Sequence, residues 1–156
     1  MRILVISDTH GNDSAIFKAH EQSGPVDILI HAGDGEQDAF LFGEVTGCTV
    51  IRVAGNCDLG SRAPRELIVT LAGKIIMITH GDRYYVKSGL ENLRKQARNQ
   101  KAQIIIYGHT HLALNEFLDS QLLLNPGTLC CQAGFHSYAI LEISQDGIEA
   151  EIHELC

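Results

Sequence analysis

The sequence has no apolar run long enough to cross a bilayer and no recognisable signal peptide. None of its hydrophobic stretches approaches the roughly 18 residues that a membrane-spanning helix needs. At the N-terminus, Arg2 is followed by only four strongly apolar residues before Ser7 and Asp8, too few for the apolar region of a secretory signal. We therefore expect a soluble, cytoplasmic protein without a membrane partner.

The sequence also lacks an excess of positive charge and cysteines with the spacing of a disulfide or zinc motif. The formal net charge is −7, so we expect no broad surface for nucleic acid. A small anionic substrate is compatible with this charge if bound metal reverses it locally. The five cysteines are an odd number without CxxC spacing, which predicts neither a disulfide framework nor a cysteine-based zinc site.

What the sequence does have is the composition of one ordinary globular domain. Its 156 residues are 45% hydrophobic and 20% charged, which is enough to bury a real core. Repeats, linkers and low-complexity segments are missing, and the sequence offers no place for a domain boundary. We therefore predict a single domain that spans residues 1–156.

The N-terminal third of the chain alternates apolar runs with helical patterns. The runs predict buried strands and the patterns predict helices between them: strands at 3–6, 26–30 and 49–53, and helices at 13–23 and 36–46. Strands that alternate with helices are typical of a parallel sheet with right-handed crossovers. The carboxyl ends of these strands should therefore lie side by side.

Polar side chains follow each of these three strands. Asp8 and His10 come after the first strand, and their side chains point to the same side of an extended chain. Asp34 stands between two glycines after the second strand, and Asn56 follows the third. Open α/β sheets bind ligands at the carboxyl ends of their strands, so we expect these residues to line one site. His31, still within its strand, is predicted to be a packed core residue.

The second half of the chain repeats this pattern. The Ala72-Gly73 pair predicts a hairpin between strands 67–71 and 74–78, and His80 follows the second of them. A further strand at 103–107 leads to His109 and His111. The other predicted elements are a helix opened by a Ser88-x-x-Glu91 capping box, strands at 112–118 and 122–124, a type II turn at Pro126-Gly127, and a final hairpin of 138–143 and 148–152.

Together the strand ends present seven nitrogen and oxygen donors: Asp8, His10, Asp34, Asn56, His80, His109 and His111. This set contains no thiolate and is too large for one tetrahedral zinc ion. It suits two metal ions about 3.5–4 Å apart that share a bridging carboxylate, as in phosphatases. We therefore predict a metal site with two ions.

The motifs D-x-H, G-D, G-N-x-D, H-G and G-H-x-H occur in this order between Arg2 and Thr128. They resemble those of the calcineurin-like metallophosphoesterase superfamily, and most of all its small single-domain phosphodiesterases from bacteria and archaea. The resemblance implies a four-layer α/β/β/α sandwich. It also implies attack on phosphorus by a metal-bridging hydroxide, with both cations lowering the pKa of the water and neutralising the developing charge.

The resemblance also assigns each donor to one of two metal ions: Asp8, His10 and His111 to the first, Asn56, His80 and His109 to the second, and Asp34 to both. Manganese is the expected metal, and nickel, magnesium, zinc, iron and cobalt are the alternatives. Four residues are expected to take part in catalysis: Asp34, Asn56, Cys57 and His109.

Two positions depart from the pattern of the superfamily. Many members have a histidine after the Asn of G-N-x-D, acting as general acid or oxyanion stabiliser, where this chain has Cys57. A thiol with a reference pKa near 8.5 cannot supply the charge of an imidazolium, so Cys57 has either a catalytic role or a packing role. Close relatives often read H-G-H where this chain has His80-Gly81-Asp82, and Asp82 would then pair with Arg83 or orient His80.

The leading functional prediction is a metal-dependent phosphodiesterase that acts on a small-molecule phosphodiester. One alternative is a non-catalytic protein-interaction scaffold, like the retromer subunit that shares this fold. The presence of a donor at all seven ligand positions favours the enzyme. The substitution of histidine by Cys57 keeps the scaffold as an alternative. The other alternative is a phosphomonoesterase: the sequence lacks a second Arg/Lys-rich loop to bind a dianionic phosphate, although Arg62 and Arg65 lie near Asn56. The physiological substrate, the native metal and a homo-oligomeric state are left open by the sequence.

Overall fold

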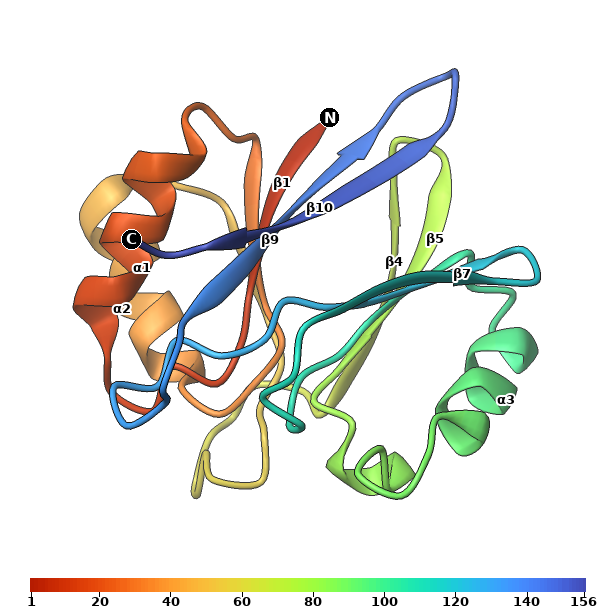
Figure 1. Ribbon diagram of the computed structural model, residues 1–156, viewed down its shortest axis with the longest axis horizontal. Helices are drawn as coiled ribbons and strands as arrows, with labels where there is room; N and C mark the ends of the chain where they lie inside the picture. The colour runs from red at the N-terminus through yellow and green to blue at the C-terminus, as the bar shows by residue number, and fades with distance from the viewer.

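Two five-stranded sheets pack face to face with helices on both outer faces in the computed structural model, which describes residues 1–156 (Figure 1). The elements follow in the order β1 (Arg2–Ile6), α1 (Asp13–Ser23), β2 (Ile28–His31), α2 (Glu36–Thr46), β3 (Val50–Arg52), β4 (Glu66–Leu71), β5 (Lys74–Thr79), the 3₁₀ turn η1 (Asp82–Tyr84), α3 (Glu91–Asn99), β6 (Ile104–Ile106), β7 (Leu114–Leu118), β8 (Gln121–Asn125), β9 (Ser137–Ile143) and β10 (Ile148–Glu154). The α/β/β/α sandwich implied by the resemblance is confirmed.

Each sheet has a parallel centre with antiparallel strands beside it. The first sheet has the order β10-β9-β1-β2-β3, in which β1, β2 and β3 are parallel. The second has the order β4-β5-β6-β8-β7, in which β5, β6 and β8 are parallel. The predicted parallel arrangement is confirmed for these central strands, while the hairpin strands pair antiparallel.

Alternating side chains of the central strands fill two different cores. In β1, Ile3 and Val5 face the second sheet, whereas Leu4 packs against the residues of α1 and α2. On the other side of the sandwich, Met77 of β5 packs against Leu93 of α3. Figure 1 shows α1 and α2 on the left and α3 on the right of the paired sheets. Because both faces of these strands are buried, they read in the sequence as continuous apolar runs.

Helices α1 and α2 have the predicted bounds, the strands agree with the prediction to within two residues at each end, and the start of α3 differs from it. The hairpin at Ala72-Gly73 is confirmed, and both residues have the positive φ that a type I′ turn requires, 46° and 78°. The capping box is wrong, because Leu90 is the N-cap of α3 and no side chain caps this helix. Ser88 instead donates its backbone N–H to Tyr85 O at 2.8 Å, in a loop that follows the unpredicted 3₁₀ turn.

None of the helices combines the length and apolarity needed to cross a membrane.

Candidate metal centre

The loops after four strands, two from each sheet, carry candidate ligands that meet across the seam between the sheets. Asp8 follows β1 and Asp34 follows β2 of the first sheet. His80 follows β5 and His111 follows β6 of the second sheet. The two sheets face each other here, since His111 Nε2 lies 3.1 Å from Asp8 Oδ1 and His80 Nε2 lies 3.2 Å from Asp34 Oδ2. The packing of the sheets therefore positions the site.

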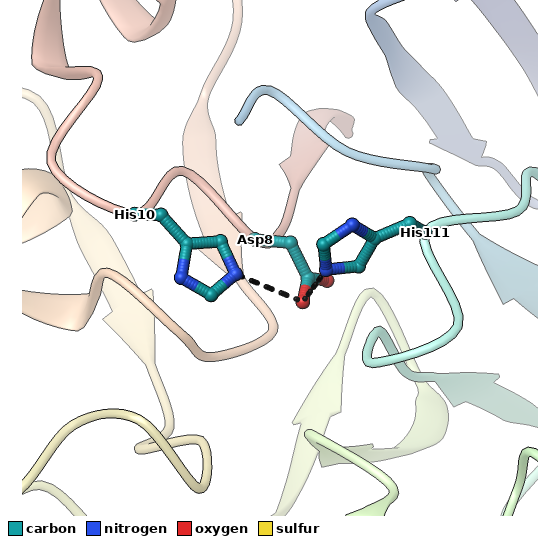
Figure 2. A group of neighbouring side chains, drawn as sticks. All are labelled: Asp8, His10 and His111. Atoms are coloured by element: carbon teal, nitrogen blue, oxygen red, sulfur yellow. Dashed lines mark ion pairs between the residues drawn. The ribbon is translucent and has the colours of Figure 1, made fainter. Parts of the chain in front are cut away.

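Asp8 is fully buried, and its carboxylate lies between the rings of His10 and His111 (Figure 2). Its Oδ2 atom accepts hydrogen bonds from Ser7 Oγ at 2.5 Å and from the backbone N–H of His109 at 3.0 Å. Its Oδ1 atom has no hydrogen-bond partner of acceptable geometry, although the Nε2 atoms of His111 and His10 lie 3.1 and 3.9 Å away. A buried carboxylate oxygen without a partner is costly, and a bound cation would satisfy it.

Asp34 lies between the histidines of the two predicted ligand sets. Its Oδ2 atom is 3.2 Å from His80 Nε2 and 3.8 Å from His10 Nε2. Its Oδ1 atom accepts the backbone N–H of Cys57 at 2.7 Å, which fixes the plane of the carboxylate. The predicted bridge between two ions requires a carboxylate at such a place.

The ring of His80 is oriented for ligation by a backbone carbonyl. Its Nδ1 atom lies 2.9 Å from Ala32 O, and because a carbonyl only accepts, Nδ1 carries the proton. In the neutral ring this leaves the lone pair of Nε2 directed at Asp34 and at His109 Nδ1, which is 3.1 Å away. Metal-binding histidines are typically held in this way by their second nitrogen.

The carboxylates and imidazoles of the site shift one another's pKa values. Burial raises the pKa of Asp8, but the nearby imidazole of His111 and the charge that His80 carries when protonated outweigh it and lower that pKa overall. Burial also raises the pKa of Asp34, but the interactions with His80 outweigh this effect and hold that pKa below its usual range. Both carboxylates are therefore ionised at neutral pH, as metal ligands must be.

Six of the seven donors form two neighbouring groups whose residue types fit divalent cations. Asp8, His10 and His111 offer ligand atoms within 4.8 Å of one another, and so do Asp34, His80 and His109. These groups match the two predicted ligand sets apart from Asn56. The Asn56 side chain is exposed and donates to Cys57 Sγ at 3.2 Å, and the structure does not bring it into hydrogen-bond contact with the other six.

Cys57 lies beside the centre, where its sulfur forms a third group with His10 and Asp34. The hydrogen bond and charge of Asp34 raise the pKa of Cys57 to about 11, so the exposed thiol is neutral at pH 7.

The predicted pairing of Asp82 with Arg83 is wrong, because neighbouring side chains in a helical turn point apart. Asp82 accepts from Arg65 at 2.6 Å instead, and Ala32 rather than Asp82 orients His80.

Asp58 is a residue of the site that sequence reasoning missed. Its carboxylate accepts backbone N–H groups from the loop after β2 and from the loop after β3: Asp34 at 2.8 Å, Gly35 at 2.8 Å, Glu36 at 3.2 Å and Gly55 at 2.7 Å. It therefore ties the loop of Asp34 to the loop of Asn56. The signal was present in the sequence, since Asp58 is the last residue of the G-N-x-D motif.

His31 joins the first two loops through a second network. The prediction of a packed core residue is confirmed, because the ring is fully buried and burial lowers its pKa to about 4. Its Nδ1 atom accepts the N–H of Gly33 at 3.1 Å, so its Nε2–H donates to Thr9 Oγ1, also at 3.1 Å. Thr9 then donates to Asp38 at 2.6 Å. The network connects residues next to Asp8 and Asp34.

The sequence is similar to those of known phosphoesterases. The sequence model described as "Calcineurin-like phosphoesterase superfamily domain" matches residues 1–146. A probable metallophosphoesterase of Bacillus subtilis is 33% identical over 159 residues, covering 99% of this chain and 91% of that protein. A phosphodiesterase of Methanocaldococcus jannaschii is 29% identical, covering 83% of this chain and 85% of its own length.

Solved structures show the same fold. A predicted phosphoesterase from Streptococcus pneumoniae superimposes with a TM-score of 0.83 at 27% identity, over 98% of this chain and 88% of that one. Vps29 of Entamoeba histolytica, solved in complex with Zn²⁺, has a TM-score of 0.76 at 19% identity and is covered completely, as is this chain. At that identity the likeness to Vps29 concerns the fold alone.

Proposed function

The chain belongs to the calcineurin-like phosphoesterase superfamily, and we propose that it is a phosphodiesterase with two divalent metal ions. One observation carries the proposal. Asp34 Oδ2 lies within 3.8 Å of both His80 Nε2 and His10 Nε2, and these two histidines belong to different groups of donors. A carboxylate shared by two groups of donors supports a pair of ions.

Each ion would be held by residues of both sheets: Asp8, His10 and His111 for the first, His80, His109 and Asn56 for the second, with Asp34 shared. When bound, the ions supply positive charge for the phosphoryl oxygens and lower the pKa of the attacking water. Manganese is our proposed metal, because the mixed imidazole, carboxylate and amide donors suit a transition metal.

The chain itself contributes a preorganised set of donors. Asp8 is held by Ser7 Oγ and the His109 N–H, so its free oxygen points at the centre before any ion arrives. His80 is held by Ala32 O and Asp34 by the Cys57 N–H. Groups that are already in place need little reorganisation when charge develops on the phosphate.

Cys57 is proposed to face the departing oxygen of the substrate. Its sulfur lies within 4.8 Å of the ligand atoms of His10 and Asp34, at the edge of the centre. A thiol is a weak hydrogen-bond donor, so it gives little help to a poor leaving group. We therefore expect the enzyme to favour diesters with good leaving groups, such as nitrophenyl esters, over alkyl or nucleoside diesters.

The test compares bis(p-nitrophenyl) phosphate with p-nitrophenyl phosphate, using metal-stripped protein before and after addition of manganese. We expect metal-dependent turnover that is faster on the diester than on the monoester. Cys57→Ala should slow the diester by no more than about tenfold, or 1.4 kcal/mol. The control is Cys156→Ala, which replaces another exposed cysteine at the C-terminal end of the sequence.

Each failure points to a different alternative. Faster turnover of the monoester would make the protein a phosphomonoesterase. Metal binding without turnover of either ester would favour the alternative of a non-catalytic scaffold. A much larger loss in Cys57→Ala, with fold and metals intact, would make the thiol essential to the chemistry.

A further inference from the structure

A hollow of about 360 Å³ opens beside the metal centre, next to His10 and His111. Its other lining residues are Cys130, Gln132 and Ala133, in the loop between β8 and β9. None of these five residues is Lys, Arg, Asp or Glu. The volume is at the lower end of the roughly 300–1,000 Å³ that small-molecule sites occupy.

The part of the lining that comes from the loop between β8 and β9 is tied directly to Asp8. Thr128 Oγ1 donates to Asp8 O at 2.9 Å and accepts the backbone N–H of Cys130 at 3.1 Å. The carbonyl of Cys130 in turn accepts the N–H of Ala133 at 2.9 Å and a hydrogen bond from His136 Nε2 at 2.8 Å. The hollow is therefore bounded by a loop whose position is fixed relative to the metal ligands.

Gln132 presents a free donor in this hollow. The thiol of the buried Cys130 donates to Gln132 Oε1 at 2.8 Å, which sets the plane of the side-chain amide. Gln132 is exposed, and its Nε2 group makes no hydrogen bond within the protein. The two N–H groups on Nε2 are left to donate to a ligand.

We propose that this hollow receives the ester group that stays on phosphorus, and that Gln132 donates to a carbonyl or hydroxyl oxygen of that group. The inference rests on the proposed phosphodiesterase function. Cys57, proposed to face the departing oxygen, does not line the hollow, so the hollow is free for the other ester group. A lining without Lys or Arg suits an uncharged group such as a nucleoside and offers no partner for a second phosphate.

The test uses two diesters with the same leaving group: methyl p-nitrophenyl phosphate and thymidine 5′-(p-nitrophenyl phosphate). With the manganese-loaded protein, Gln132→Ala should lower kcat/KM for the thymidine ester about tenfold and for the methyl ester less than about twofold. Ala133→Phe should fill the hollow and show the same selective loss. Gln100→Ala, which replaces an exposed glutamine at the C-terminal end of α3, is the control and should change neither ester.

The outcomes separate this inference from the function on which it rests. Turnover of both esters with an unchanged ratio in Gln132→Ala and Ala133→Phe would overturn the assignment of the hollow and leave the phosphodiesterase standing. Equal losses on both esters would also overturn it, because they would show a general effect on the centre. Absence of metal-dependent turnover of either ester by the wild type would overturn the proposed function and the inference together.

Discussion

The backbone of the candidate ligands is held in a conformation that residues other than glycine rarely adopt. The φ angles are positive at five of the seven: Asp8, His10, Asp34, His109 and His111, with values from 48° to 69°. Such residues cost on the order of 1–3 kcal/mol each and cluster at functional sites, where the surrounding structure holds them. Here backbone hydrogen bonds such as Asp8 N to Gly33 O, at 2.9 Å, provide part of that support.

The bridging role of Asp34 predicts a change in metal content as well as in turnover. Asp34→Asn removes the charge between His10 and His80, so we expect loss of activity and weaker binding of both ions. Elemental analysis after dialysis and the diester assay would measure the two effects. In the comparison variant, His31→Ala, two hydrogen bonds are lost and stability should fall by about 2 kcal/mol, with metal content retained. Near-wild-type metal and turnover in Asp34→Asn would contradict the bridge.

Asp58 is predicted to support metal binding without touching the metal. Asp58→Asn places an NH₂ group against two backbone N–H donors, which should lower the free energy of unfolding by on the order of 2 kcal/mol and weaken manganese binding. Urea unfolding and calorimetric titration would measure these changes. Asp119→Asn is the matched control, because Asp119 is exposed and only pairs with Arg94 at the surface. Equal behaviour of the two variants would rule out the proposed support.

For single residues, the sequence predicted which residue types form the metal site, but it did not predict the hydrogen bonds that hold them in place. Asp8, His10 and His80 are visible in the sequence because each follows an apolar strand, where a polar residue stands out. The role of Asp58 depends on partners that come from two loops, and the role of His31 depends on Thr9 and Gly33. Such contacts are set by the tertiary structure, which a pattern along the chain does not contain.

Among the elements, those with a strong local signal were predicted best. Helices α1 and α2 have the predicted bounds, 13–23 and 36–46, because each ends at a glycine. The distribution of strands between two sheets was not predictable from the residues, and only the resemblance implied it. Strand β1 pairs with β9, joining Val5 to Ala139, and nothing local in either strand specifies so distant a partner.

The end of α3 gives a prediction about stability that does not involve the site. Lys101 follows the helix with a φ of 56°, where glycine is preferred because it has no Cβ. Lys101→Gly should therefore raise the free energy of unfolding by about 0.5–1 kcal/mol, measured by urea denaturation. Lys95→Gly, at an exposed position within the helix, should lower it by about 1 kcal/mol. A loss in Lys101→Gly as large as in Lys95→Gly would contradict this reading of the helix end.

For the whole molecule, the main consequence of the fold is that the centre needs both sheets. The first sheet supplies Asp8 and Asp34, and the second supplies His80, His109 and His111. A shared core that includes Val5 and Ile78 holds the sheets together beneath these loops. We therefore propose that residues 1–156 act as one unit, in which neither sheet can form the metal centre alone.

One chain is proposed to hold two divalent ions that share Asp34. The most direct measurement is the number and position of the ions in manganese-loaded protein, by calorimetric titration of metal-stripped protein and anomalous diffraction from its crystals. We predict two ions per chain, one beside Asp8 and His111, the other beside His80 and His109, and both in contact with Asp34. A folded chain that binds a single ion, or two ions of which only one touches Asp34, would contradict the claim.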